Sequence, residues 1–254
     1  MVTLTTDFGT ADGYVGAVKG SILSVNPKAH LVDLSNEIPS YDIIVGAYHL
    51  GNAFHFYPKG TIHLAVVDPG VGSNRRPLLI VTKNYYFVGP DNGLFTRVVQ
   101  KDPALAIYEL TEKCYFRTDV SHTFHGRDLF GPVAAHLSLG VSPAKFGKKR
   151  EGMKLLPDFT PVQHSEGIFG KILFFDKFGN AFSNIQGVKS FEWKCVVLGG
   201  QEIPLYRTYS EIPKGEAGAI FGSSGFLEIA LREDSFQNKC SASKKGVEIL
   251  LKRK

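Results

Sequence analysis

Long apolar runs are absent from this chain of 254 residues, and so is a pattern of paired cysteines. No stretch approaches the roughly 20 apolar residues that a membrane-spanning helix needs. The three cysteines, Cys114, Cys195 and Cys240, are far apart and odd in number, which fits neither a disulfide framework nor a cysteine metal site. The sequence therefore predicts a protein of a reducing compartment that does not associate with membranes.

Targeting and phosphate-binding signatures are missing as well. The chain starts with Val2–Thr6, a strand pattern without the basic start and apolar core of a signal peptide, so we expect a cytoplasmic protein. Neither the Rossmann nor the Walker glycine pattern occurs, which argues against a phosphate cradle. Since no close histidine pair with a third ligand occurs either, we expect no metal and no other cofactor.

What is present is an ordinary globular composition with a basic excess. Apolar residues make up 43% of the chain, charged residues make up 21%, and the net charge is +5. Lys145–Arg150 and Lys244–Lys254 carry much of this charge with Phe146 as their one aromatic residue, which is typical of a solvated surface. We therefore expect no nucleic-acid partner, and a role in steering an anionic ligand stays open.

The order of apolar segments predicts two domains. Residues 1–155 alternate strand patterns with helical ones, which favours a mostly parallel sheet flanked by helices. Lys148–Glu151 and Leu156–Pro161 have the composition of a linker. Residues 156–254 show short strand patterns, turns and no long helix, which is typical of a small all-β barrel or sandwich. The predicted class is α/β, with a smaller C-terminal β-barrel domain.

The segment Val66–Arg76 is the most distinctive in the chain. An apolar strand pattern ends in Asp68, a turn rich in glycine follows, and Arg75 and Arg76 precede the next apolar run. Asp68 would thus stand at a strand end, where open α/β sheets bind ligands. A carboxylate and a guanidinium this close indicate either a prepared polar site or a solvated surface ion pair, and the local pattern alone favours the surface pair.

Two other segments place polar residues beside predicted helix starts. Asp7 and Asp12 follow the first strand, where a carboxylate either binds a ribose diol or caps the next helix. His125 and Gly126 precede a helical pattern, and the free N–H groups of a helix start favour an anion or a polarised water. A histidine there either transfers or orients a proton or is only structural.

Two turns in the second half of the chain are also compatible with either a structural or a ligand-binding role. Asp176–Asn180 is either a plain hairpin loop or a purine site, with Asn180 reading the base edge and Phe178 stacking on it. The serines of Gly222–Glu228 could hold a carboxylate, but a polar turn is the simpler interpretation.

Taken together, these segments resemble the S-adenosyl-L-methionine (SAM) hydroxide adenosyltransferases, relatives of the fluorinating and chlorinating adenosyl transferases. The resemblance covers nearly the whole chain, and its motifs are specific jointly. They are TDFG (6–9), VVDPGVG (66–72), GPDNGL (89–94), TFHGRD (123–128), FGN (178–180) and SSGFLEIAL (223–231).

The resemblance implies a fold, an assembly and a reaction. The fold is a seven-stranded α/β N-terminal domain with a C-terminal β-barrel, and the assembly is a homotrimer whose active sites lie between the N-terminal domain of one subunit and the C-terminal domain of the next. The reaction is hydrolysis of SAM to adenosine and L-methionine. The positions that prepare the water match Asp68, Arg75 and His125, with Arg76 as the alternative to Arg75.

The resemblance also implies substrate-binding residues in the N-terminal part. Asp7 matches the carboxylate that holds the ribose diol, and Asp12 matches a nearby acidic position. Tyr41 matches an aromatic wall beside the adenosine.

Further binding residues are implied in the C-terminal part. Asp176 and Asn180 match positions that contact the methionine amine and the adenine edge, and Ser223 falls near the residue that holds the methionine carboxylate. Phe178 is the candidate stacking face. The segment Asp234–Cys240 replaces the small residues that are usual in the family.

Two alternative functions remain at this point. One is a halide-dependent adenosyl transferase, and the other is a non-catalytic protein that binds SAM or a nucleoside. The halide-using branches carry a tyrosine where Asp68 stands, and the fluorinating branch carries a serine where Gly126 stands. An acid at position 68 repels a halide by like charge, which favours hydrolysis.

Overall fold

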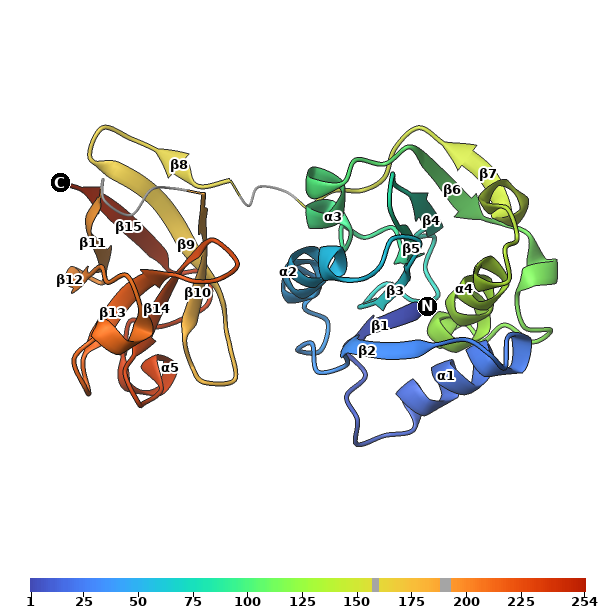
Figure 1. Cartoon of the computed structure of the whole chain (residues 1–254), viewed down its shortest axis with the longest axis horizontal. Coiled ribbons are helices and arrows are strands. Elements are labelled where there is room, and N and C mark those ends of the chain that lie inside the picture. Colours follow the sequence, from blue (N-terminus) through green and yellow to red (C-terminus); the bar gives the residue numbers. More distant parts are fainter. Residues whose placement is uncertain (157–159, 188–192) are drawn as a thin grey trace. The chain divides into compact units, whose positions relative to one another are not determined.

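The computed structural model describes residues 1–156, 160–187 and 193–254 of the chain. It divides into two compact units, Met1–Leu156 and Pro157–Lys254 (Figure 1). Each unit has its own hydrophobic core and its own sheet.

The N-terminal unit is built on a seven-stranded sheet with the order β2-β1-β3-β5-β4-β6-β7. The strands are β1 (Val2–Thr6), β2 (Leu31–Ser35), β3 (Ile62–Val66), β4 (Pro77–Val81), β5 (Tyr86–Pro90), β6 (Ala106–Leu110) and β7 (Gly147–Arg150). Strands β2, β1, β3 and β5 are parallel, and β4, β6 and β7 extend the sheet with antiparallel pairs. All five residues of β1 and of β3 are buried, as expected for central parallel strands.

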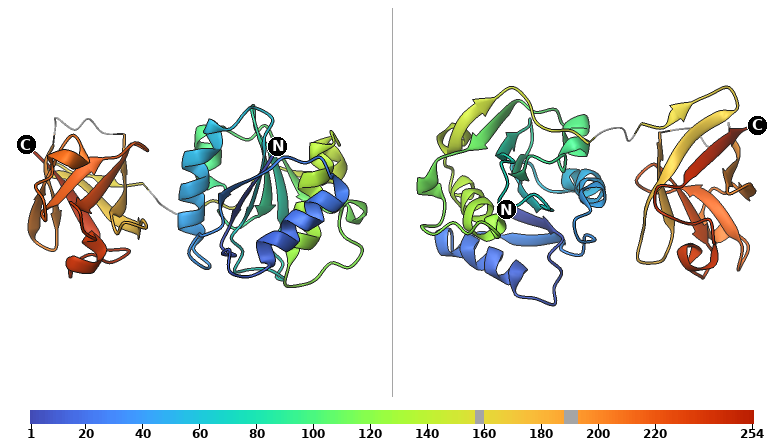
Figure 2. Two further views of the ribbon diagram at one scale, coloured as in Figure 1. Left: turned by 60° about the horizontal axis from the view of Figure 1, so that its bottom comes forward. Right: turned by 180° about the vertical axis from the view of Figure 1, so that it is seen from behind.

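Helices cover both faces of this sheet, with α1 beside α4 on one face and α2 beside α3 on the other (Figure 2). Asp42 caps the second helix, because its Oδ1 accepts a hydrogen bond of 3.1 Å from the Val45 N–H. The α-helices are α1 (Tyr14–Val25), α2 (Ile43–Ala53), α3 (Thr96–Lys101) and α4 (Gly131–Ser138). The shorter turns are η1 (Phe54–Phe56), η2 (Lys113–Tyr115), the π-helical η3 (Gly126–Phe130) and η4 (Pro143–Phe146).

The linker prediction for Lys148–Glu151 is wrong over most of its length. Lys148, Lys149 and Arg150 belong to β7, which pairs with β6 at the edge of the sheet. An edge strand is held by backbone hydrogen bonds, and its charged side chains keep a second edge from pairing with it. The basic run therefore belongs to the folded sheet even though it has the composition of a linker.

The C-terminal unit is an antiparallel sheet with the order β12-β11-β15-β9-β10-β14-β13, and β8 lies beside β9. Leu205, directly after β12, bridges to Ala219 of β13, so the ends of the sheet approach each other as in a nearly closed barrel. The strands are β8 (Val162–Gln163), β9 (Gly167–Phe175), β10 (Ala181–Gln186), β11 (Trp193–Leu198), β12 (Gln201–Pro204), β13 (Ala217–Phe221), β14 (Phe226–Leu231) and β15 (Glu248–Arg253), with η6 (Tyr209–Glu211) and α5 (Phe236–Lys239). The predicted class is confirmed in both units.

His63 on β3 is a buried histidine of the N-terminal core. Its Nδ1 lies 2.8 Å from Thr3 Oγ1, and its ring stacks on Phe87 with 5.1 Å between centroids. Burial lowers the pKa of His63 to about 3. The folded state therefore keeps this ring neutral, whereas the unfolded chain protonates it below its ordinary pKa.

This burial predicts an acid-sensitive contribution to stability. As the pH falls below the ordinary histidine pKa of about 6.5, the free energy of unfolding should fall faster in the wild type than in His63→Phe, by up to about 1.4 kcal/mol per pH unit. The contribution is complete above that pH, because the folded pKa lies below the unfolded one. Urea titrations between pH 4 and 8 measure it, and parallel curves for both proteins would contradict it.

Candidate active site

A cavity of about 590 Å³ opens in the N-terminal unit where β1 and β3 end. Asp7 follows β1 directly, and Asp68 lies just beyond β3. This is the edge at which parallel α/β sheets bind ligands. The lining residues are Asp7, Phe8, Asp12, Tyr14, Ser40, Tyr41, Val66, Asp68, Val71, Ser121, Thr123, Phe124, His125, Gly126 and Arg127.

Asp68, Arg75 and His125 meet in one connected group. Arg75 Nε donates to both carboxylate oxygens of Asp68, at 2.9 and 2.8 Å, and Arg75 Nη2 pairs with the same carboxylate. That Nη2 also lies 2.8 Å from His125 Nδ1. The side chains of Asp68 and Arg75 are only 4% and 9% exposed, so the solvated ion pair favoured by the local pattern is wrong.

The contact with Arg75 decides the state of the His125 ring. A guanidinium only donates hydrogen bonds, so His125 Nδ1 accepts from Arg75 and carries no proton. Burial and the charge of Arg75 both lower the pKa of His125. At neutral pH the ring is therefore a neutral imidazole that presents its Nε2–H as a donor.

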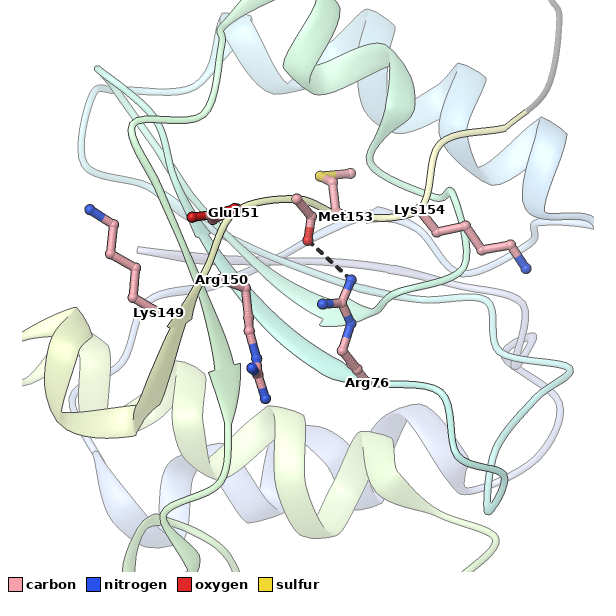
Figure 3. Close-up of a pocket in the computed structure, with 7 residues that line it drawn as sticks. Arg76, Lys149, Arg150, Glu151, Met153 and Lys154 are labelled. Carbon is pink, nitrogen blue, oxygen red and sulfur yellow. Dashed lines mark hydrogen bonds between the residues drawn. The ribbon is translucent and has the colours of Figure 1, made fainter.

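The adjacent Arg76 has different partners. Its Nε and Nη2 donate to Asp91 Oδ2 at 2.8 and 2.5 Å, and Nη2 also donates to the Gly152 carbonyl at 3.0 Å (Figure 3). This side chain lines a pocket of about 740 Å³ together with residues 149–154, and Figure 3 shows how these side chains lie. Neighbouring residues of an extended chain point to opposite sides, and the structure thus places Arg75, not Arg76, beside Asp68.

The loop that carries Asp68 is held by the GPDNGL segment, to which the sequence analysis assigned no role in the site. Asn92 Nδ2 donates to the Val67 carbonyl at 2.8 Å. Gly72 has φ +79°, and a Cβ there would lie 2.6 Å from the His122 carbonyl oxygen. The Asn92 hydrogen bond fixes the backbone before Asp68. The backbone after Asp68 requires glycine at position 72, because only glycine adopts this positive φ in so little space.

Asp7 and Tyr41 are joined at the rim of the cavity. The Tyr41 N–H donates to Asp7 Oδ2 at 2.8 Å, and Tyr41 has φ +67° with 73% of its surface exposed. Burial raises the pKa of Asp7, and the charge of Asp68 adds to this.

The cap of α1 is Gly13, without a side-chain hydrogen bond, so the helix-cap interpretation of Asp7 and Asp12 is wrong.

Three aromatic side chains of the cavity belong to the candidate segments, but the sequence alone assigned them no role in binding. Phe8, Tyr14 and Phe124 pack on one another with ring centroids 5.4 to 6.2 Å apart. All three line the cavity, and two of them belong to the TDFG and TFHGRD motifs. Their position in or beside these polar motifs was the sequence signal that could have assigned them to the cavity.

The C-terminal candidates lie in two turns of the second unit. Asp176 Oδ1 accepts from the N–H groups of Phe178 and Asn180, both at 2.9 Å, and Asn180 Nδ2 donates to Asp176 Oδ2 at 3.1 Å. This leaves Phe178 65% exposed. Ser223 lies in the turn between β13 and β14. The structure thus brings Asp176, Phe178 and Asn180 together in one turn.

Over the parts of the chain that the structure describes, no group of three or more His, Cys, Asp or Glu side chains is arranged to hold a metal ion. Over the same parts, no helix combines the length and the apolarity that crossing a membrane requires.

An α/β unit with a shielded carboxylate and guanidinium beside a half-buried imidazole, in a cavity at its strand ends, has the architecture of an enzyme for a small ligand. Residues 2–147 match the SAM hydroxide adenosyltransferase N-terminal domain, and residues 170–246 match the C-terminal domain of the same family. The chain therefore belongs to the SAM hydroxide adenosyltransferase family, and the resemblance drawn from its motifs is confirmed.

Individual relatives agree with this membership. The (R)-S-adenosyl-L-methionine hydrolase of Thermus thermophilus is 38% identical in an alignment of 242 positions, which covers 92% of each chain. A fluorinase of Actinoplanes sp. is 23% identical in an alignment of 268 positions, which covers 91% of this chain and 90% of the fluorinase. The crystal structure of an uncharacterized conserved protein from Thermotoga maritima superposes with a TM-score of 0.90, at 33% identity and 98% coverage of both chains.

Proposed function

We propose that this protein hydrolyses SAM to adenosine and L-methionine by in-line attack of a water-derived hydroxide on C5′. Family membership and the 38% identity to a protein named SAM hydrolase support the reaction. The observation that carries the proposal is the connected group of Asp68, Arg75 and His125, in which the side chains of Asp68 and Arg75 are shielded from solvent. It supplies a proton acceptor, a positive charge and a hydrogen-bond donor for a water nucleophile.

The substrate itself explains why so few groups are required. Its C5′ is bonded to a sulfonium, which leaves as a neutral thioether, so no acid has to protonate the leaving group. The enzyme must hold one water in line with the C5′–S bond and remove its proton. No metal and no other cofactor enters this proposal.

Within this mechanism, Asp68 accepts the proton. Its Oδ1 accepts one hydrogen bond from Arg75 and keeps a second lone pair, whereas its Oδ2 accepts two hydrogen bonds from Arg75. A proton on His125 would instead place an imidazolium against the Arg75 guanidinium, which Coulomb repulsion disfavours. His125 then orients the water through Nε2–H, and the Arg75 charge stabilises the hydroxide.

Water is favoured over halide as the nucleophile. An ionised Asp68 repels a halide, and Gly126 offers no hydroxyl group to hold one. Incubation of the pure protein with SAM and chloride or fluoride, followed by chromatography, should yield adenosine alone. A 5′-halo-adenosine product would favour the transferase, and binding without any product over hours would favour the non-catalytic protein.

The proposal assigns substrate contacts to the residues that the resemblance implies. Asp7 binds the ribose diol, Tyr41 flanks the adenosine and Asp12 contributes to the same cavity. In the second unit, Asp176 binds the methionine amine and Asn180 the adenine edge, while Phe178 stacks and Ser223 binds the carboxylate. We further propose a cytoplasmic homotrimer, which light scattering on the pure protein tests.

Asp7→Asn is expected to raise KM for SAM about tenfold and to leave kcat within threefold, because a neutral amide accepts hydrogen bonds from a diol more weakly than a carboxylate. The 2′-deoxy analogue of SAM is the control, since it lacks one of the two hydroxyl groups. Steady-state kinetics with both compounds measure the effect. An equal loss on both compounds would contradict the assignment of Asp7 to the diol.

A further inference from the structure

Glu228 on β14 is an acid that the mechanism above does not use. It stands in register with Phe182 of β10 and Ile220 of β13. Its neighbours Leu227 and Ile229 are buried in the core of the barrel. Because side chains alternate along a strand, Glu228 points away from that core.

Glu228 is nevertheless half-buried, and it has no donor in the described parts of the chain. Among the described residues, no hydrogen bond or ion pair reaches its carboxyl group. A Cβ built on Gly222 would lie 1.7 Å from Glu228 Oε1, so the carboxyl group packs directly against the backbone where the turn bearing Ser223 begins. Burial and the nearby charge of Asp176 raise the pKa of Glu228 to about 7.

Asp176, unlike Glu228, has hydrogen-bond donors from the protein. Both of its oxygens accept hydrogen bonds from N–H groups of its own turn. One acid of the pair thus has donors from the protein and the other has none. An unpaired, shielded carboxylate is costly, and a cationic ligand with several N–H donors removes that cost.

We propose that Glu228 is a specificity-determining residue, which binds the α-ammonium group of the substrate together with Asp176. This inference rests on the proposed function and adds to it the second carboxylate for the amine. An ammonium group has one positive charge and three N–H donors, so it satisfies Glu228 and offsets the repulsion between the two acids.

The surroundings of Glu228 make its recognition of the amine depend on pH. Asp176 acts on it from the β9–β10 turn, Phe182 and Ile220 are apolar, and the β13–β14 turn contributes serine hydroxyls. The charged group of α5, which also packs on β14, is Lys239, and it pairs with Asp234 at 3.6 Å. Glu228 therefore loses its proton across the neutral range, and the affinity for the amine rises from pH 6 to 8.

Kinetics with two substrates test the inference. The substrates are SAM and its des-amino analogue, which keeps the sulfonium and the carboxylate. At pH 8, Glu228→Gln should raise KM for SAM about tenfold, leave kcat within threefold, and change KM for the analogue less than twofold. At pH 6, where Glu228 is protonated, wild type and variant should agree within about threefold. Glu228→Asp should recover part of the preference for SAM at pH 8.

The matched control is Glu248→Gln, which changes an exposed acid of the same unit and should alter neither substrate. Melting curves establish that each variant is folded. Equal losses on both substrates, or a loss for SAM that is the same at pH 6 and 8, would overturn the role of Glu228 while leaving hydrolysis intact. A wild type that releases adenosine from neither substrate would overturn the proposed function itself.

Discussion

Asp68→Asn is expected to lower kcat for SAM hydrolysis by about a hundredfold or more and to leave KM within threefold. Asparagine has nearly the same shape and keeps an oxygen for Arg75, so the cavity is preserved. It has no charge, however, and does not accept the proton of the attacking water. Steady-state release of adenosine measures both constants.

The control for this variant is Asp119→Asn, which changes an exposed acid that does not line the cavity. It should retain the wild-type kcat. Turnover within threefold of wild type in Asp68→Asn would show that the proton goes elsewhere, and His125 would then be the next acceptor to test.

The second large effect is expected at Arg75. Arg75→Lys keeps the charge but loses the forked contact with Asp68 and the hydrogen bond to His125, so kcat should fall about a hundredfold. The neighbouring Arg76→Lys should keep kcat within threefold, because Arg76 binds Asp91 and the Gly152 carbonyl instead.

This pair of variants contains its own control, since both make the same substitution at adjacent positions. Thermal melting separates lost turnover from lost stability, because removing the partner of a buried carboxylate also destabilises the fold. A larger loss of kcat in Arg76→Lys than in Arg75→Lys would contradict the placement of the two side chains.

The fold class was predictable because its signals are local. The apolar runs of β1 and β3 and the cap at Asp42 each follow from a few neighbouring residues. The strand β7 was missed because its pairing with β6 is distant in the sequence and its composition is that of a solvated segment.

The candidate site was predictable as a set of residues but not as a geometry. Motif order indicated Asp68, Arg75 and His125 together, yet sequence alone did not separate Arg75 from Arg76, whose partners depend on the turn before β4. Glu228 was not predicted as a site residue, because a polar residue between apolar ones is typical of an exposed strand position. The Gly222 turn packs against its carboxyl group, and the charge of Asp176 acts on it from another turn.

The most direct test of the account is hydrolysis of SAM in heavy-oxygen water. If Asp68, Arg75 and His125 direct a water to C5′, the adenosine formed will carry one heavy oxygen in its 5′-hydroxyl group and the methionine will carry none. Mass spectrometry of the two products reads this out. Unlabelled adenosine, or no adenosine at all, would contradict the central claim.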